Sequence, residues 1–257
     1  MIPKIIHYCW FGKNPKPPLV QRCIESWRKY CPDYEIKEWN EDNFDVACNA
    51  YVKEAYAASK WAFVADYARL WIVYHFGGVY LDTDVELIRP IDDLLKLEGF
   101  FGFENHNLIN TGLGFGAVYG NKLVGLMLAD YENVHFLKPD GTFDLTTCPV
   151  RNTDSLRRKC PEIGKGINKI AVDGSVLFPE EYFCPMSPDG KKMNRTKKTY
   201  SIHWYSALWL TENEQIVHEY RLFRAKCERL FGERIGGIAA RFVYLFKPSK
   251  RAILKKM

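Results

Sequence analysis

The sequence predicts an α/β fold built on a mostly parallel central sheet, with a basic helical extension at the C-terminus. The first observation is a strand, helix, strand alternation over residues 4–39, and the second is a long apolar helix over residues 61–76 that leads into another short strand. Such alternation is typical of parallel sheets with helices on their faces. The third is a concentration of basic residues near the C-terminus. We therefore expect a globular domain at 1–220 and a basic amphipathic tail at 221–257.

The early part of the chain divides into regular elements by its apolar spacing and by the turn residues between them. The pattern predicts a strand at 4–9, a Pro-rich loop at 14–18, a helix at 19–30 and a strand at 34–39. Asn40 is expected to cap a further helix that begins near Glu41. Residues 138–169 are richer in Gly, Pro, Thr and Arg, which indicates loops that could close over an acceptor.

The helix predicted over residues 61–76, WAFVADYARLWIVYHF, is apolar on almost all sides. Asp66 and Arg69 lie three residues apart, so both project from one face. On a surface helix the simplest interpretation would be an exposed ion pair. A helix that is apolar all round is expected to be buried, so we expect the two charges to point into a site. The tandem Gly77 and Gly78 should end the helix.

Two carboxylates follow the next predicted strand. Residues 79–81 are β-formers, and Asp82 and Asp84 stand two apart beyond them, so an extended strand end would turn both carboxylates to the same side. The two groups repel each other unless a cation lies between them. Oxygen ligands with room for water and phosphate suit Mg²⁺ or Mn²⁺. Tyr80 shares this face and is expected to line the same pocket. An isolated Asp-x-Asp is common, however, and is often a solvated turn.

Two runs of the chain, Ala65-Asp66-x-x-Arg69 and Gly77-Gly78-Val79-Tyr80-Leu81-Asp82-Thr83-Asp84, resemble the signature of the DXD-containing sugar transferases of glycosyltransferase family 32. This family includes bacterial polysaccharide enzymes and yeast mannosyltransferases and is related to the clostridial glucosylating toxins. Further segments are similar to the family: IPKIIHYCWFG, INTGLGFGAVYGNKL, VLFPEEYFCP and TYSIHWYSALW. The resemblance covers about residues 1–210 and implies a GT-A-like nucleotide-binding domain.

The resemblance implies a role for the central candidates. Trp10 would stack on the nucleotide base. Asp66 and Arg69 would bind the hydroxyls of the donor sugar and its diphosphate. Asp82 would contact the ribose and the sugar, and Asp84 would be the direct metal ligand.

Other roles follow from the flanking segments of the resemblance. Asn110 resembles a residue that faces the donor, and Trp209 one that lies near the β-phosphate. Family members commonly have Ser before this Trp, whereas this chain has Leu, so His203 is the substitute candidate for a metal ligand. The simpler alternatives stay open: a turn former at Asn110, a core indole at Trp10 and a structural imidazole at His203.

The resemblance implies retaining, metal-dependent transfer from a nucleotide-sugar, with a UDP-sugar favoured, to a saccharide acceptor that is free or lipid-linked. The role would be in bacterial surface polysaccharide or capsule synthesis, with Mn²⁺ or Mg²⁺ as cofactor. Breaking the bond to the diphosphate builds negative charge on the leaving group, which a metal on Asp84 and the guanidinium of Arg69 would stabilise. No carboxylate stands out as a covalent nucleophile, in agreement with a front-face route.

Two other classes remain open from the residues alone. The run VYLDTDV also fits a haloacid-dehalogenase-type phosphohydrolase with Asp82 as nucleophile and Asp84 as acid. That class expects a downstream acidic pair, a lysine and a hydroxyl motif, and nothing after residue 86 supplies a convincing set. The other class is a non-catalytic module that binds membrane or polymer through the basic tail.

Residues 221–257 hold eleven Lys or Arg and two Glu, a net charge of +9, whereas the whole chain carries +5. Five apolar residues of the tail fall on one helical stripe: Ile235, Ile238, Ala239, Phe242 and Phe246. The helix could lie on an anionic membrane surface or dock on the domain with a solvated basic face. No nucleic-acid-binding motif accompanies the charge, so nucleic acid is not an expected partner.

The eight cysteines contain no C-x-x-C pair and no histidine at ligand spacing, so we expect buried thiols. The N-terminal MIPKIIHY has no apolar run of signal-peptide length, and no stretch of about eighteen apolar residues occurs. These patterns predict a location in the reducing cytoplasm. The basic tail adds the option of peripheral attachment to the inner face of the cytoplasmic membrane.

Overall fold

The computed structural model describes residues 1–105, 107–165, 169–187, 189–207 and 212–245. The chain divides into two compact units. Unit 1 comprises residues 1–184 and 196–203, and unit 2 comprises residues 185–195 and 204–257.

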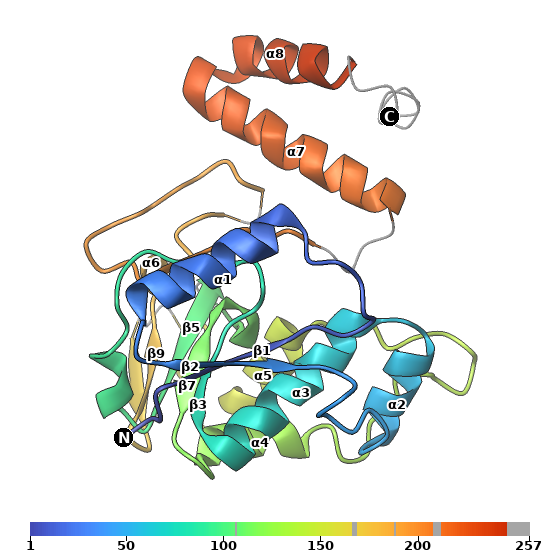
Figure 1. The fold of residues 1–257 in the computed structure, drawn as a ribbon, viewed down its shortest axis with the longest axis vertical. Helices are drawn as coiled ribbons and strands as arrows, with labels where there is room; N and C mark the ends of the chain where they lie inside the picture. The colour runs from blue at the N-terminus through green and yellow to red at the C-terminus, as the bar shows by residue number, and fades with distance from the viewer. Residues whose placement is uncertain (106, 166–168, 188, 208–211, 246–257) are drawn as a thin grey trace. The chain divides into compact units, whose positions relative to one another are not determined.

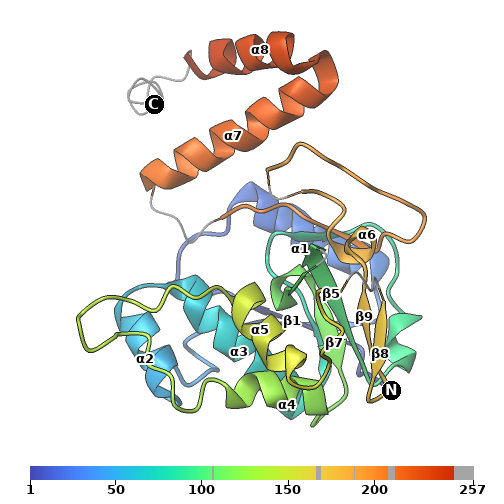
Figure 2. The same ribbon diagram turned by 180° about the vertical axis from the view of Figure 1, so that it is seen from behind.

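Within the described residues, unit 1 is built on an eight-stranded sheet with the order β2-β1-β3-β7-β5-β9-β8 and with β6 beside β5 (Figures 1 and 2). The strands are β1 (Ile5–Cys9), β2 (Glu35–Trp39), β3 (Gly78–Tyr80), β5 (Gly99–Asn105), β6 (Leu108–Ile109), β7 (Phe115–Ala117), β8 (Ile170–Val172) and β9 (Ser175–Phe178). Strands β1, β2 and β3 are parallel, β7 runs antiparallel to both β3 and β5, and β9 is parallel to β5. Five strands therefore share one direction, and the predicted α/β class with a mostly parallel sheet is confirmed.

The helices of unit 1 are α1 (Pro18–Tyr30), α2 (Ala50–Ala57), α3 (Trp61–Phe76), α4 (Lys122–Ala129), α5 (Cys148–Arg157) and α6 (Glu180–Phe183), with 3₁₀ turns η1 (Leu94–Lys96) and η2 (Thr111–Leu113). A second sheet pairs β4 (Val85–Leu87) antiparallel with β10 (Ser201–His203). Helix α3 packs on β1, β3 and β7, whereas α1 packs on β4, and the two helices lie on opposite sides of β1 (Figure 1). Strands β2 and β3 lie on opposite sides of β1 in the sheet, and the chain enters them through α1 and α3 respectively. Because both crossovers are right-handed, the two helices lie on opposite faces of the sheet.

Helix α3 has the burial that its sequence predicts, since nine of its residues are buried, Asp66 and Arg69 among them. It ends at Gly77, and the next residue, Gly78, starts β3 at φ +98°. A Cβ on Gly78 would lie 2.8 Å from Nε2 of His7. That imidazole lies between the carbonyl of Gly77, 2.9 Å from Nε2, and the indole N–H of Trp39, 3.1 Å from Nδ1. Burial lowers the pKa of His7 to about 4, so a neutral ring fixes the turn that leads into β3.

The helix expected near Glu41 is not formed there. Residues 40–49 are rich in Asn and Asp, and their side chains bond the local backbone: Asn40 Oδ1 accepts from the N–H of Asp42 at 2.9 Å. These local bonds compete with helix formation. The helix starts instead at Ala50, where Asn49 is the N-cap and accepts from the N–H groups of Tyr51 and Val52.

The expectation of loops throughout residues 138–169 is also wrong, because α5 occupies Cys148–Arg157. Proline and threonine suggested loops by composition, but here Thr147 is the N-cap and Pro149 lies in the first helical turn. Proline is favoured in that turn because its missing N–H would have no helical partner.

All eight cysteines lie in described residues and none forms a disulfide, as expected. Seven are buried, but Cys48 is exposed. The expectation of buried thiols is therefore wrong for Cys48, which lies in the polar turn region before α2.

Unit 2 contains the segment 185–195 and a helical hairpin formed by α7 (Glu212–Phe231) and α8 (Glu233–Leu245) (Figure 1). Gly232, at φ +79°, makes the turn between the two helices. The predicted helical extension is present, and the boundary expected at residue 220 falls inside α7. Phe246 and the basic end of the tail lie outside the described residues. No helix in the part of the chain that the structure describes is long and apolar enough to cross a membrane.

Replacing Asn49 with Ala should lower the free energy of unfolding by about 1–2 kcal/mol, because two N–H groups at the start of α2 lose their acceptor. Chemical denaturation would measure the change. Asn40→Ala is the matched control: this half-buried side chain accepts from one N–H group, that of Asp42, outside any helix, so its loss should cost less. Equal losses in the two variants would contradict the N-cap assignment.

Candidate active site

A tight turn, and not a strand, brings the two carboxylates of the Asp-x-Asp motif together. Strand β3 ends at Tyr80, and the N–H of Val85 donates to the carbonyl of Asp82 at 2.9 Å. The prediction that an extended strand end aligns Asp82 and Asp84 is therefore wrong about the backbone. Because the chain reverses within four residues, the carboxylates still face one site.

His203 reaches this site through long-range strand pairing. Strand β10 pairs with β4 so that His203 lies opposite Val85, directly after Asp84. Its Nε2 is 3.2 Å from Oδ1 of Asp84. Helix α1 supports β4, since the indole of Trp27 donates to the carbonyl of Val85 at 2.8 Å and Ser26 Oγ accepts from the N–H of Leu87.

Asp82, Asp84 and His203 form a cluster that could hold a metal ion. Each offers one ligand atom, and these atoms lie within 4.8 Å of one another. Two carboxylate oxygens and one imidazole nitrogen fill half of an octahedral shell and leave positions for water and phosphate oxygens. The predicted roles of Asp84 and His203 as metal ligands are compatible with this geometry.

The guanidinium of Arg69 lies at the centre of the remaining contacts. Its Nη2 is 3.0 Å from Oδ1 of Asp66 and 3.1 Å from Oδ1 of Asp82. The hydroxyl of Tyr80 donates to the same Asp82 oxygen at 3.0 Å, and the guanidinium lies 5.1 Å from the Tyr80 ring centre. The Arg69 side chain is only 4% exposed, whereas that of Asp82 is 25% exposed. Arg69 and Tyr80 therefore position Asp82, which is the most open member of the group.

Cys148 is a site residue that the sequence reasoning missed. As the first residue of α5, it places its sulfur 3.4 Å from Nη1 of Arg69 and 3.5 Å from Oδ1 of Asn110. Asn110 also accepts from the N–H of Gly112 at 2.6 Å, so it does form a turn, and it contacts the Arg69 group through Cys148. The Thr-Cys-Pro run that starts α5 was the available signal.

Gly112 is the second site residue that the sequence reasoning missed. The site requires glycine at this position for steric reasons. A Cβ there would lie 2.3 Å from Oδ2 of Asp82, 2.9 Å from Oδ1 of Asn110 and 3.1 Å from Nη1 of Arg69. Any side chain would thus displace the carboxylate.

Carboxylates outnumber the fixed cation in this group, since Asp66, Asp82 and Asp84 surround Arg69 and His203. Burial, together with the neighbouring Asp84, raises the pKa of Asp82 to about 6, although Arg69 opposes the shift. Burial likewise raises the pKa of Asp66 against the effect of Arg69. Burial acts to lower the pKa of His203, but the carboxylates of Asp84 and Asp82 outweigh it and raise the pKa. A bound cation would relieve the repulsion between the carboxylates.

Trp10 and Trp209 were the predicted aromatic contacts. Trp10 follows β1, and its indole donates to the carbonyl of Asn14 at 2.7 Å while Nζ of Lys16 lies 5.6 Å from its ring. Because β1 and β3 are parallel neighbours, Trp10 and Asp82 follow carboxyl ends at the same sheet edge, where α/β folds bind ligands. Trp209 lies outside the described residues.

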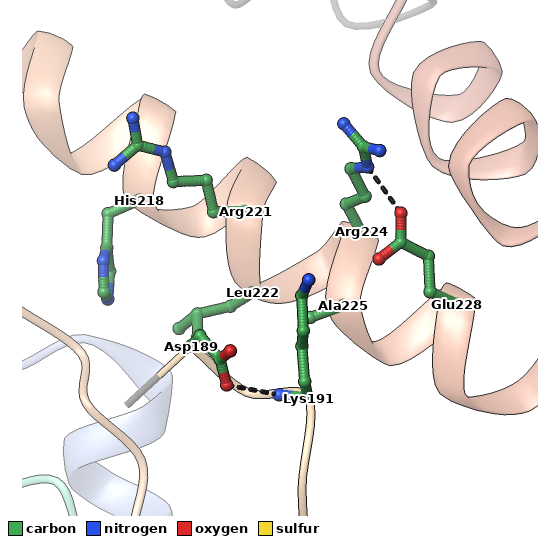
Figure 3. A pocket seen from close by; sticks show the side chains of 8 residues that line it. All are labelled: Asp189, Lys191, His218, Arg221, Leu222, Arg224, Ala225 and Glu228. Atoms are coloured by element: carbon green, nitrogen blue, oxygen red, sulfur yellow. Dashed lines mark hydrogen bonds and ion pairs between the residues drawn. The ribbon is translucent and has the colours of Figure 1, made fainter. Parts of the chain in front are cut away.

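Unit 2 holds a separate cavity of about 640 Å³ that includes none of the residues above (Figure 3). Its lining carries both charges: Asp189, Lys191, His218, Arg221, Arg224 and Glu228, with Leu222 and Ala225. Nε of Arg224 lies 2.7 Å from Glu228, and Asp189 accepts from the N–H of Lys191 at 3.0 Å (Figure 3). The cavity is thus largely balanced in charge.

Residues 17–101 match the family model described as the glycosyltransferase sugar-binding region containing the DXD motif. The matched segment contains Asp66, Arg69, Asp82 and Asp84, whereas His203 lies outside it. This match confirms the resemblance to DXD sugar transferases over residues 17–101. It gives no support to the phosphohydrolase interpretation of the same carboxylates.

Two relatives from Schizosaccharomyces pombe are similar over part of their length. Inositol phosphoceramide mannosyltransferase 1 is 29% identical over 110 residues, which are 38% of this chain and 33% of the relative. Inositol phosphoceramide mannosyltransferase 3 is 34% identical over 102 residues, which are 37% of this chain and 27% of the relative. The chain therefore spans about a third of the length of these relatives. Among solved structures, a glycosyltransferase involved in the glycosylation of the major capsid of PBCV-1 superposes with a TM-score of 0.48 at 12% identity, over 84% of this chain and 98% of that one.

Replacing Gly112 with Ala should displace Asp82, weaken Mn²⁺ binding and lower the free energy of unfolding by about 1–3 kcal/mol, the cost typical of overpacking. Calorimetric titration with Mn²⁺ and thermal denaturation would measure both effects. Gly237→Ala is the control, because its nearest contact would be 3.5 Å away on a helix. A Gly112→Ala variant that binds Mn²⁺ like the wild type would contradict the steric argument.

Proposed function

We propose, from the match of residues 17–101 to the glycosyltransferase sugar-binding region containing the DXD motif, that this chain transfers a hexose from a nucleotide-sugar to a saccharide acceptor with retention of configuration. The observation that carries the proposal is the cluster of Asp82, Asp84 and His203, whose ligand atoms lie within 4.8 Å of one another. The cluster follows the carboxyl end of β3, where ligands of α/β folds bind.

The proposed cofactor is Mn²⁺ or Mg²⁺, held by Asp82, Asp84 and His203. Two carboxylates suit both ions, and the imidazole nitrogen makes the donor set softer than the all-oxygen shell that Mg²⁺ prefers, which favours Mn²⁺. When bound, the cation would neutralise the negative charge that develops on the departing diphosphate.

The chain's own residues orient this site. Arg69, held between Asp66 and Asp82, keeps the Asp82 carboxylate facing the donor position, and the hydroxyl of Tyr80 fixes the same oxygen. Asp82, the most exposed of these side chains, is placed to accept hydrogen bonds from donor hydroxyls. Trp10, at the same sheet edge, offers an aromatic face to the nucleotide base.

The donor is proposed to be a UDP-sugar. Two similar yeast proteins bear the name mannosyltransferase, so an activated mannose is the second donor to test. The acceptor would be a saccharide, free or lipid-linked, in surface polysaccharide or capsule synthesis in the cytoplasm. Thermal shift with a panel of nucleotide-sugars, with and without Mn²⁺, would identify the donor. A ligand at a hundred times its Kd should stabilise the protein by about 2.7 kcal/mol.

Asp84→Asn should reduce transfer and donor hydrolysis at least about a hundredfold while leaving the fold intact, because the cation loses a charged ligand. Product formation with the identified donor would be measured, with circular dichroism to check the fold. Asp154→Asn is the matched control, since within the described residues Asp154 makes only an exposed ion pair with Arg157. Turnover in Asp84→Asn comparable to that of the control would contradict the assignment of Asp84 as a metal ligand.

Mn²⁺ affinity should fall as the pH is lowered from 7 to 5. Asp82 has a raised pKa of about 6 and gains a proton in this range, and His203 also has a raised pKa; both must lose their protons to bind the ion. The same raised pKa of Asp82 means that its contribution to the stability of the metal-free fold is present in acid and is lost as the pH rises through 6. Calorimetric titration at several pH values tests the affinity, and a flat profile would argue against these ligands.

A further inference from the structure

Helix α8 contacts α7 through its small residues. Gly236 and Ala240, four apart, are buried on the same face of α8. A Cβ on Gly236 would lie 2.4 Å from both the Cα and the backbone N of Glu228 in α7. The two helix backbones therefore approach closely at this point, which only glycine allows.

The large apolar residues of the hairpin are left exposed. Ile235 and Ile238, three apart on one stripe of α8, are 64% and 67% exposed. They form an exposed surface, here termed the apolar ridge, whose members are Leu230, Phe231, Ile235, Ile238, Phe242 and Val243. The first two end α7, and the others line α8. Several large apolar side chains exposed on one short hairpin indicate a surface that binds something.

The charge beside the ridge is positive. Arg234 and Arg241 are exposed and lie seven residues apart, so they follow one stripe of α8 next to the ridge. Of the two acidic residues after position 220, Glu228 is bonded to Arg224 of the same helix. An apolar stripe flanked by arginines is the arrangement that places rings and aliphatic chains among lipid tails and guanidinium groups at the headgroups.

We propose that the apolar ridge docks on an anionic lipid bilayer, with α8 lying in the plane of the interface. The positive charge beside the ridge favours anionic lipid over a second copy of the chain. Two copies would bring their arginines together, whereas anionic headgroups complement the arginines. The length of α8 is compatible with a helix that lies in the interface plane. Its 13 residues rise about 20 Å, which is too short to cross a bilayer core of about 30 Å. The surface would hold the proposed transferase beside a lipid-linked acceptor, but the docking does not depend on that activity.

Sedimentation of the full chain with phosphatidylcholine vesicles, with and without phosphatidylglycerol, tests the proposal. We expect binding to the anionic vesicles that weakens as salt is added. Ile238→Ser should lower the partition coefficient about tenfold or more, because one buried aliphatic side chain is lost from the lipid. Arg234→Gln and Arg241→Gln should each lower it about fivefold.

Leu145→Ser is the matched control, since Leu145 is 59% exposed in unit 1 and should not alter partition. Anionic vesicles that bind the Ile238→Ser variant as strongly as the wild type would overturn the proposal. So would the absence of vesicle binding together with self-association in sedimentation velocity that Ile238→Ser abolishes, because the ridge would then bind a second copy. The assay needs no donor or metal, so an inactive enzyme that still binds vesicles would refute the proposed function alone.

Discussion

The ion pairs of the buried Arg69 guanidinium are the interaction on which the site depends. One nitrogen, Nη2, contacts both Asp66 and Asp82, and burial of either carboxylate without it would be costly. Burial nevertheless raises the pKa of both carboxyls against the opposing effect of this guanidinium. Asp84 adds a third carboxylate beside them. Carboxylates thus outnumber the fixed cation at this site, and this imbalance favours the divalent cation that we propose to bind there.

The site is assembled from distant parts of the chain, each held by its own structural requirement. The pairing of β10 with β4 delivers His203 to Asp84, and α1 holds β4 through Trp27. Helix α5 delivers Cys148 to the guanidinium, and Gly112 leaves the space that Asp82 occupies. Because the family match ends at residue 101, His203, Cys148 and Gly112 complete a site whose charged centre lies inside the matched region.

The sequence predicted the parts of the site that local patterns encode. The apolar surround of Asp66 and Arg69 indicated a buried helix with functional charges, and both residues are buried. The geometry of Asp82 and Asp84 was predicted from strand periodicity and is made by a turn, because local hydrogen bonding ends β3 early. For Cys148 the local Thr-Cys-Pro pattern signals only a helix start, since the relevance of its sulfur comes from a contact with Arg69, far away in the chain. Helix starts were missed where the residue types that form turns also begin helices. Asn40 forms a turn whereas Asn49 caps α2, and Pro149, which suggested a loop, lies in the first turn of α5.

In the tail, too, the sequence pattern predicts the apolar stripe of the helix, whereas only the packing shows which residues contact α7. Helical periodicity placed Ile235 and Ile238 on one stripe, and a stripe alone is equally compatible with packing on a protein core or on lipid. Small residues make the contact with α7, because Gly236 and Ala240 let α8 approach it more closely than a stripe of isoleucines could. The helix is therefore held by its least hydrophobic apolar residues and exposes its most hydrophobic ones. Such an arrangement costs stability in water, so its persistence is understandable if the surface is covered when the protein works.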